Sequence, residues 1–283
     1  MTPPATPAQP TSPLVKSRGS TFVGEALLSL PPEQFPSVMP LLPDTAWTTT
    51  ALHVLSRKQG RVRVDTSATP QCLIVIAAGD PALRTLDRAF LFGTATSEAM
   101  KSFVRDVKTP TELVCDQSAA DLVRKTHPTA RMRESIVYSF ARLEDAHAIE
   151  STPGAKRLRI SDAESIATLV PPIALRTFRS VRELVTGGSA FVVQEEGAVI
   201  AAAFSVDHSS KHERILVATQ EARRKQGHGT MVGRRLVKSI AEQGRIPCAV
   251  VDRSDLAGVA LAEKLGFNHK MQILTFTTRL QSI

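Results

Sequence analysis

The chain has 283 residues, of which 42% are hydrophobic and 22% charged, and its formal net charge is +8. This is the composition of an ordinary globular protein, and no apolar run approaches the length of a membrane span, which excludes low-complexity and membrane-spanning chains. The length suits two modest domains or one large one.

The first eighteen residues are rich in proline and lack the basic and apolar segments of a signal peptide. We expect a disordered tail over residues 1–18. The three cysteines, Cys72, Cys115 and Cys248, are widely spaced and each lies in an apolar run, so we expect buried, reduced thiols. These features predict a cytoplasmic protein.

Residues 19–150 alternate between strand and helix patterns. We expect strands over 72–78, 88–92, 111–115 and 135–140, and helices over 96–107 and 118–125. The alternation predicts a divergent α/β domain with a layered sheet. Because this part has no phosphate loop and no acid–base pair, two roles stay open: one wall of a substrate cleft, or scaffold alone.

A polar, irregular stretch around residues 151–154 predicts a linker to a second domain over 155–283. We expect a strand over 158–160, a helix opened by a capping box over 161–164, and a second helix over 174–184. Strands follow over 189–194 and 198–206, joined by a hairpin turn with glycine at 197. Later strands are expected from 212 to 219, from 247 to 252 and from 271 to 278.

The segment 217–230 is the most informative stretch of the chain. A strand ends in a basic loop with two glycines, and from Gly229 the apolar residues follow a helical period. The first amides of a helix have no intrahelical acceptor, and the helix dipole places partial positive charge there. Glycines at 227 and 229 would let an anion approach these amides closely. The segment therefore predicts a pyrophosphate site.

The spacing of this loop separates it from other phosphate loops. A dinucleotide fingerprint starting at Gly227 would need glycine at Val232, and a P-loop would need Gly-Lys-Ser/Thr. The spacing Arg-x-x-Gly-x-Gly from Arg224 to Gly229, and Leu-Ala-Glu-Lys-Leu-Gly-Phe over 261–267, resemble the GNAT acyltransferases. The second motif is similar to a two-part subfamily that includes the zwittermicin A resistance type of acetyltransferase.

The resemblance implies a C-terminal GNAT acyl-CoA N-acyltransferase fold with a central mixed sheet, preceded by a divergent, degenerate GNAT-like α/β domain. It also implies that acetyl-CoA (coenzyme A) binds along the strand end and the loop, with one strand amide polarising the thioester carbonyl. The implied donor-binding residues are Val217, Ala218, Thr219, Arg224, Lys225, Gln226, Gly227, His228, Gly229, Thr230 and Asp255.

The sequence indicates the general base and the proton donor less clearly than it indicates the donor-binding loop. Glu213 is the carboxylate nearest the position where many GNAT enzymes place a base, and an exposed strand-end charge is the alternative. The usual GNAT tyrosine falls at Ala262, which leaves water or Ser254 as the proton donor to the thiolate. We expect His208 and His212 to be surface polar residues rather than metal ligands, so no metal site is predicted.

We predict an acetyl-CoA-dependent N-acetyltransferase acting on a primary amine, with a small molecule favoured over a protein, by direct attack in a ternary complex. A non-catalytic acyl-CoA-binding module stays open, since Ala262 replaces the phenol. The net charge alone suggests a nucleic-acid-associated protein, but aromatic residues that could stack on bases are few. No membrane partner is expected, and a homodimer stays open.

Overall fold

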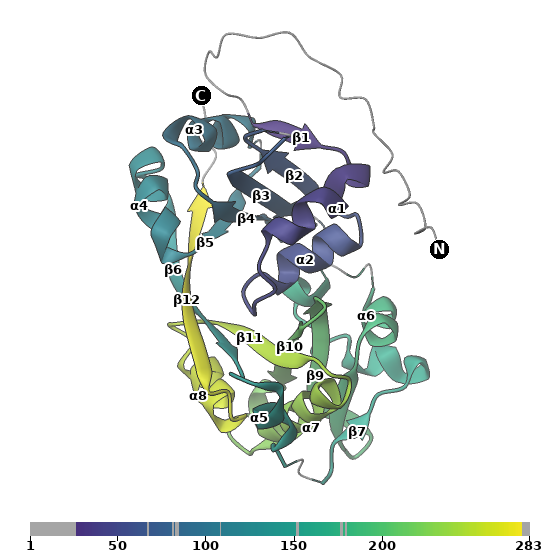
Figure 1. Ribbon diagram of the computed structural model, residues 1–283. Helices are drawn as coiled ribbons and strands as arrows, with labels where there is room; N and C mark the ends of the chain where they lie inside the picture. Colours follow the sequence, from purple (N-terminus) through teal and green to yellow (C-terminus); the bar gives the residue numbers. More distant parts are fainter. Residues whose placement is uncertain are drawn as a thin grey trace, which may run out of the picture.

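The computed structural model describes residues 27–278, except for positions 67, 81, 83–84, 108, 151–152, 176–177 and 179 (Figure 1). The tail expected over residues 1–18 lies outside the described residues. None of the helices in the described part of the chain combines the length and hydrophobicity needed to span a bilayer.

The N-terminal half, residues 27–150, begins with short elements and continues as alternating strands and helices. Its strands are β1 (Leu28–Leu30), β2 (Arg61–Val64), β3 (Cys72–Ala77), β4 (Asp87–Gly93), β5 (Thr111–Cys115) and β6 (Arg131–Ser139). Its helices are α1 (Phe35–Val38), α2 (Thr49–Ser56), α3 (Ser97–Asp106), α4 (Gln117–Thr126) and α5 (Leu143–His147), with 3-10 helices over Pro32–Gln34 and Met39–Leu41.

The C-terminal half, residues 153–278, repeats this alternation. Its strands are β7 (Lys156–Arg157), β8 (Ala190–Glu195), β9 (Ala198–His208), β10 (His212–Thr219), β11 (Ile246–Asp252) and β12 (His269–Thr278). Its helices are α6 (Val181–Gly187), α7 (His228–Glu242) and α8 (Leu256–Lys264), with 3-10 helices over Ile160–Ile166, Pro172–Leu175 and Glu221–Arg223.

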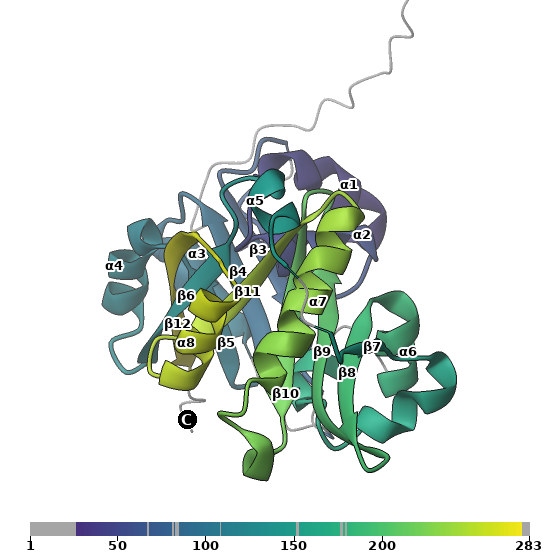
Figure 2. The same ribbon diagram turned by 90° about the horizontal axis from the view of Figure 1, so that it is seen from below.

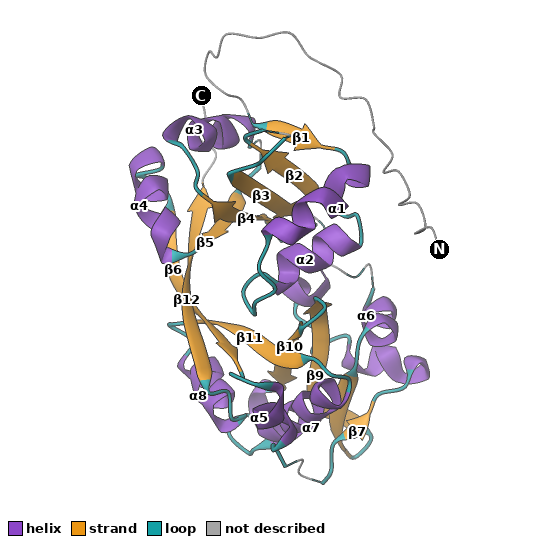
Figure 3. Ribbon diagram, in the orientation of Figure 1, coloured by secondary structure: helices purple, strands orange, loops and turns teal. Residues whose placement is uncertain are grey.

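All strands join one 12-stranded sheet in the order β1-β2-β3-β4-β5-β12-β6-β11-β10-β9-β8-β7 (Figure 3). The last strand of each half is exchanged: β6 pairs with β11 and β12 of the C-terminal half, while β12 pairs with β5 and β6 of the N-terminal half. Each half therefore completes the sheet of the other, and the expected division into domains at residues 150–155 stays a prediction.

The two halves share one order of elements around a parallel strand pair. In the N-terminal half β4 pairs antiparallel with β3 and parallel with β5, and in the C-terminal half β10 pairs antiparallel with β9 and parallel with β11. Helix α3 links the first parallel pair and α7 links the second. The mixed α/β fold class predicted from the sequence is confirmed.

Buried strands carry apolar residues on both faces of the sheet. On β3, Leu73 and Val75 pack with α1 and α2, whereas Ile74 and Ile76 pack with α3 and α4 on the opposite face. Figure 1 shows α1 and α2 inside the curve of the sheet. In the C-terminal half α7 packs over β9 and β10, as Figure 2 shows from below. Burial on both faces of the sheet explains why the sequence of β3 lacks hydrophobic alternation.

Helix α2 and the loop before it join the two halves through buried polar contacts. Thr50 Oγ1 donates a hydrogen bond of 2.9 Å to Asp207 Oδ2 at the end of β9, and Asp207 forms an ion pair with Arg214 on β10. Asp44 accepts a hydrogen bond of 2.6 Å from the Ser209 hydroxyl in the β9–β10 turn. These contacts fix the N-terminal half against β9 and β10.

The sequence predictions for the first part of the C-terminal half need correction. No capping box forms in the described residues of this segment, because Arg159 is the N-cap of a 3-10 helix and the Ser161 hydroxyl contacts Asp162 instead. The predicted strand over 158–160 is β7, two residues earlier. The predicted helix over 174–184 is a 3-10 helix ending at Leu175 and α6 beginning at Val181.

Two further side-chain predictions can be compared with the structure. All three cysteines are free and buried, as predicted, and burial raises the pKa of the Cys248 thiol to about 12. The surface placement of His212 is wrong, whereas His208 is half-buried. His212 is buried with its Nδ1 atom 3.1 Å from Asp44 Oδ1, and His208 packs edge-on against the ring of His53.

Candidate functional site

The predicted pyrophosphate loop connects the end of β10 to the start of α7. Gly227 is the N-cap of α7 and has φ of +89°, a conformation that glycine adopts at little cost. A Cβ on Gly227 would meet no described atom within 4 Å, so this side of the loop is open. The positive φ at this position therefore favours glycine.

Gly229 has a packing role, and its predicted part in anion binding stays a prediction. A Cβ at this position would lie 3.2 Å from Thr219 Oγ1 and 3.5 Å from a methyl group of Val217. Glycine therefore lets the first turn of α7 pack closely on the end of β10. This packing places the helix N-terminus next to the last residues of the strand.

The N-termini of α7 and α3 differ in how their free amides are satisfied. At α3 the Thr96 hydroxyl accepts a hydrogen bond of 3.1 Å from the Ala99 N–H group. At α7, Gly227 offers no side chain, and among the described residues no side-chain cap is found there. The amides at the start of α7 can therefore bind an anion, with the helix dipole adding to the attraction.

The charged side chains of the loop make a small network with the β8–β9 hairpin. Glu195 lies 3.2 Å from Arg223 Nη2 and 3.5 Å from His228 Nε2. The hairpin turn itself is confirmed, with φ of +50° at Glu196 and +82° at Gly197. Among the loop cations, Arg224 is exposed, and its Nε atom lies 3.5 Å from the carbonyl oxygen of Thr219.

Strands β10 and β11 stop pairing partway along their length. Their parallel register runs from His212 opposite Ile246 to Arg214 opposite Cys248, and within the described residues no pair follows. Beyond Arg214, β10 still pairs with β9 as far as Thr219, while β11 pairs with β6 as far as Asp252. One edge of the segment Val217–Thr219 therefore has backbone groups free for an added strand-like ligand.

The predicted general base, Glu213, lies on β10 before the point at which β10 and β11 stop pairing. Glu213 is buried near the start of β10, and its Oε2 atom accepts a hydrogen bond of 2.7 Å from Arg245. The carboxylate is therefore not the exposed strand-end charge that the sequence allowed as an alternative. Arg245 forms an ion pair with Glu213, and the role of Glu213 as a base stays a prediction.

The other predicted site residues lie at the end of β11 and the start of α8. The Ser254 hydroxyl donates a hydrogen bond of 2.6 Å to Asp252 Oδ1, and Asp255 caps α8 by accepting one of 2.9 Å from the Gly258 N–H group. Ala262 is buried in the core beneath α7. Because β10 and β11 run parallel, the loop and these residues follow strand ends at the same edge of the sheet, whereas Glu213 lies near the start of β10.

A family model for GNAT acetyltransferases matches residues 40–276. The chain belongs to this family. The match includes most of both halves, so the N-terminal half is part of the family pattern and not an unrelated addition.

Solved structures with this fold include other GNAT proteins. A GCN5-related N-acetyltransferase-like protein from Streptococcus suis is 21% identical, with a TM-score of 0.60 and coverage of 86% of this chain and 98% of that one. A GCN5-related N-acetyltransferase from Sphaerobacter thermophilus is 12% identical, with a TM-score of 0.60 and coverage of 91% and 96%. A tandem GNAT protein from the clavulanic acid biosynthesis pathway is 12% identical, with a TM-score of 0.59 and coverage of 90% and 99%. No curated protein matches the chain.

Sequence reasoning missed two groups in this GNAT protein. Asp252 ends β11 with a partly exposed carboxylate, and the hydrogen bonds from Ser254 lower its pKa below the ordinary value. Tyr138 on β6 is buried, and its hydroxyl has no hydrogen-bond partner among the described residues. Strand alternation could have pointed to Asp252, which shares a face with Cys248 and Val250.

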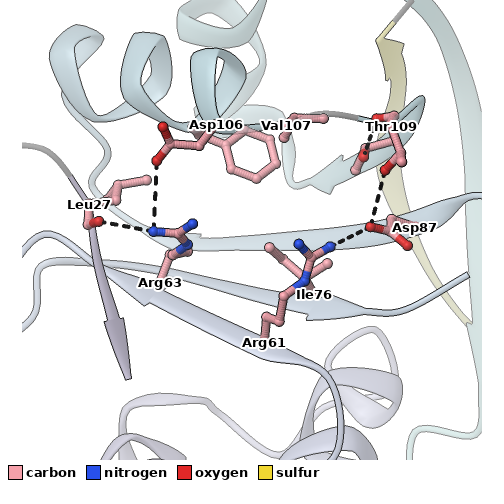
Figure 4. A pocket seen from close by; sticks show the side chains of 10 residues that line it. Leu27, Arg61, Arg63, Ile76, Asp87, Asp106, Val107 and Thr109 are labelled. Carbon is pink, nitrogen blue, oxygen red and sulfur yellow. Dashed lines mark hydrogen bonds and ion pairs between the residues drawn. The ribbon is translucent and has the colours of Figure 1, made fainter. Parts of the chain in front are cut away.

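A separate cavity of about 350 Å³ lies in the N-terminal half of the GNAT sheet, between β2 and the C-terminal end of α3 (Figure 4). Arg61 pairs with Asp87, and Arg63 lies 3.7 Å from Asp106. Both guanidinium groups therefore already have a carboxylate partner within the protein. The cavity lies at the opposite end of α3 from its capped N-terminus, so it does not correspond to the loop at the N-terminus of α7.

Proposed function

We propose that this protein transfers an acetyl group from acetyl-CoA to a primary amine of a small molecule, by direct attack in a ternary complex. The observation that carries the proposal is the uncapped start of α7, in the described residues, beside the end of the β10–β11 pairing. The amides from Arg224 to Thr230 would bind the pyrophosphate, and the free edge of Val217–Thr219 would pair with the pantetheine arm. Asp255 would orient the start of α8 beside the donor.

The reaction needs one bond formed and one broken. The neutral amine nitrogen attacks the thioester carbonyl carbon, the carbon–sulfur bond breaks, and an amide forms. The attacking nitrogen gives up a proton, which Glu213 would accept through water, and the departing thiolate takes one from water or Ser254. An amide in Val217–Thr219 would stabilise the oxyanion. The proposed location is the cytoplasm.

We further propose that the protein belongs to the two-part subfamily that includes the zwittermicin A resistance type of acetyltransferase. The two halves joined by exchanged strands support it, since they place the N-terminal half beside β11. A non-catalytic acyl-CoA-binding module is the second candidate. It is favoured by one observation, the buried Ala262 at the position of the usual phenol.

Turnover separates these two functions. The purified protein is incubated with acetyl-CoA and each of four amines: butylamine, hexylamine, putrescine and 1,6-diaminohexane. Release of the CoA thiol is followed with a thiol reagent, and the acetylated amine is identified by mass spectrometry. Thiol release that depends on an amine supports the enzyme. Tight binding of acetyl-CoA without release of thiol would instead support the binding module.

A further inference from the structure

Alternation along β11 assigns its side chains to two faces. Ala249 and Val251 pack with the α7 core, whereas Cys248 and Val250 pack on the opposite face with the N-terminal core. Asp252 follows in the second series and lies 3.7 Å from Arg133 Nη1 on β6. Its carboxylate therefore points away from α7, where the donor pyrophosphate is proposed to bind, and toward the N-terminal half.

The other carboxylates around the end of the β10–β11 pairing are engaged. Asp207 is buried and paired with Arg214. Glu213 is buried and paired with Arg245, and Glu195 belongs to the loop network on the donor side. Asp252 lies on the face away from α7, and its side chain is 32% exposed although Arg133 and Ser254 lie beside it. A ligand on this face can reach it.

Asp252 is held in place but keeps capacity to accept a further hydrogen bond. The Ser254 N–H and hydroxyl groups donate to Oδ1 at 2.9 and 2.6 Å. At 3.7 Å the Arg133 contact to Oδ2 is longer than a hydrogen bond. Arg133 is itself paired with Glu112 of β5, so the N-terminal half supplies the groups beside this carboxylate.

The position of Asp252 decides which part of an acceptor it would meet. Asp252 is four residues beyond Cys248, the last β11 residue paired with β10, which corresponds to about 13 Å along an extended strand. Ala218 lies equally far beyond Arg214 on β10, so Asp252 is level with the proposed oxyanion amides but on the strand across the opening, with its side chain on the face away from α7. The carboxylate is therefore offset from the reacting nitrogen across the sheet rather than along it. Its lowered pKa also makes it a weak proton acceptor and a stable negative charge.

We propose that Asp252 binds a second cationic group of the acceptor, so that the enzyme prefers diamines and related polycationic amines over monoamines. This inference rests on the proposed function, because it concerns the acceptor side of the same site. Asp252 is then a specificity-determining residue that touches the substrate away from the reacting nitrogen.

The test compares kcat/KM for matched pairs: putrescine with butylamine, and 1,6-diaminohexane with hexylamine. In the parent protein we expect at least one diamine to exceed its monoamine by about 10- to 100-fold, the range for a charge-assisted hydrogen bond. In Asp252→Asn this ratio falls to near one, while the KM for acetyl-CoA stays within about threefold. Asp252→Glu keeps part of the preference.

Glu134 provides a matched control. Its side chain is also 32% exposed and pairs with an arginine, Arg253, but it projects from the opposite face of β6. Glu134→Gln should leave the diamine preference unchanged. If the parent acetylates amines without a diamine preference, or if Asp252→Asn keeps the parent's ratio, the inference is overturned and the proposed function stands. If the parent acetylates no amine in the panel, both are overturned.

Discussion

The buried ion pair between Asp207 and Arg214 should be the most sensitive polar contact where α2 meets β9 and β10, because Asp207 also accepts the hydrogen bond from Thr50 of the N-terminal half. Replacing Asp207 by Asn leaves the Arg214 guanidinium without its counter-charge, in a side chain that is only 7% exposed. The Nε atom of Arg214 already lacks a partner among the described residues. The substitution therefore leaves the buried charge of Arg214 less well compensated. It also weakens the hydrogen bond that Thr50 donates to residue 207, because the carboxylate acceptor is lost.

Removing one partner of a buried ion pair costs about 3–5 kcal/mol. We expect the free energy of unfolding of Asp207→Asn to fall by roughly that amount. Thr50→Val, which removes one hydrogen bond, should cost about 1 kcal/mol. The double variant Asp207→Leu, Arg214→Met should cost less than Asp207→Asn alone, because it leaves no uncompensated charge.

Urea unfolding followed by circular dichroism measures these differences. Arg61→Gln is the control, because Arg61 forms an ion pair with Asp87 but its side chain is 58% exposed, and the loss there should be below about 1 kcal/mol. If Asp207→Asn costs no more than this control, the buried pair does not stabilise the junction of α2 with β9 and β10.

Three further predictions address single groups. As the predicted base, Glu213→Gln should lower kcat by at least about 100-fold, and a folded variant with unchanged kcat would leave Glu213 only as the partner of Arg245. Tyr138→Phe should raise the free energy of unfolding by about 1 kcal/mol, since it removes a buried hydroxyl without a described partner; a loss of stability in urea would contradict this. Burial lowers the pKa of His53 below the ordinary 6.5, so the unfolded chain binds protons first as pH falls below that value and the free energy of unfolding should fall between pH 7 and pH 5. His53→Gln should reduce this pH dependence, and an unchanged slope would show that other groups cause it.

Local signals in the sequence predicted the elements that carry their own pattern. The strand at 111–115, the helix capped by Thr96 and the hairpin at Glu195–Gly197 were all predicted close to their observed bounds. The loop before α7 was recognised because its glycines and cations have a fixed spacing. In each case the residues that determine the structure are within a few positions of one another.

Features that depend on distant contacts could not be predicted in this way. The exchange of β6 and β12 pairs residues that are at least 130 positions apart in the sequence, and neither strand carries a signal for its partner. Likewise α2 is short and is stabilised by packing against β3 and β9 rather than by its own propensity. The capping-box pattern at Ser161 failed because the local backbone forms a 3-10 helix, in which that side chain finds another partner.

The central claim is that acetyl-CoA binds at the start of α7, and calorimetric titration tests it most directly. Gly227→Val is compared with Gly244→Val, because both glycines have positive φ, of +89° and +78°, and a Cβ at either would meet no described atom within 4 Å. The two variants carry similar backbone strain near opposite ends of the same helix. We predict one-to-one binding in the parent and in Gly244→Val, with a Kd at least about tenfold higher in Gly227→Val. A folded parent protein that does not bind acetyl-CoA, or equal Kd values for the two variants, would contradict the account.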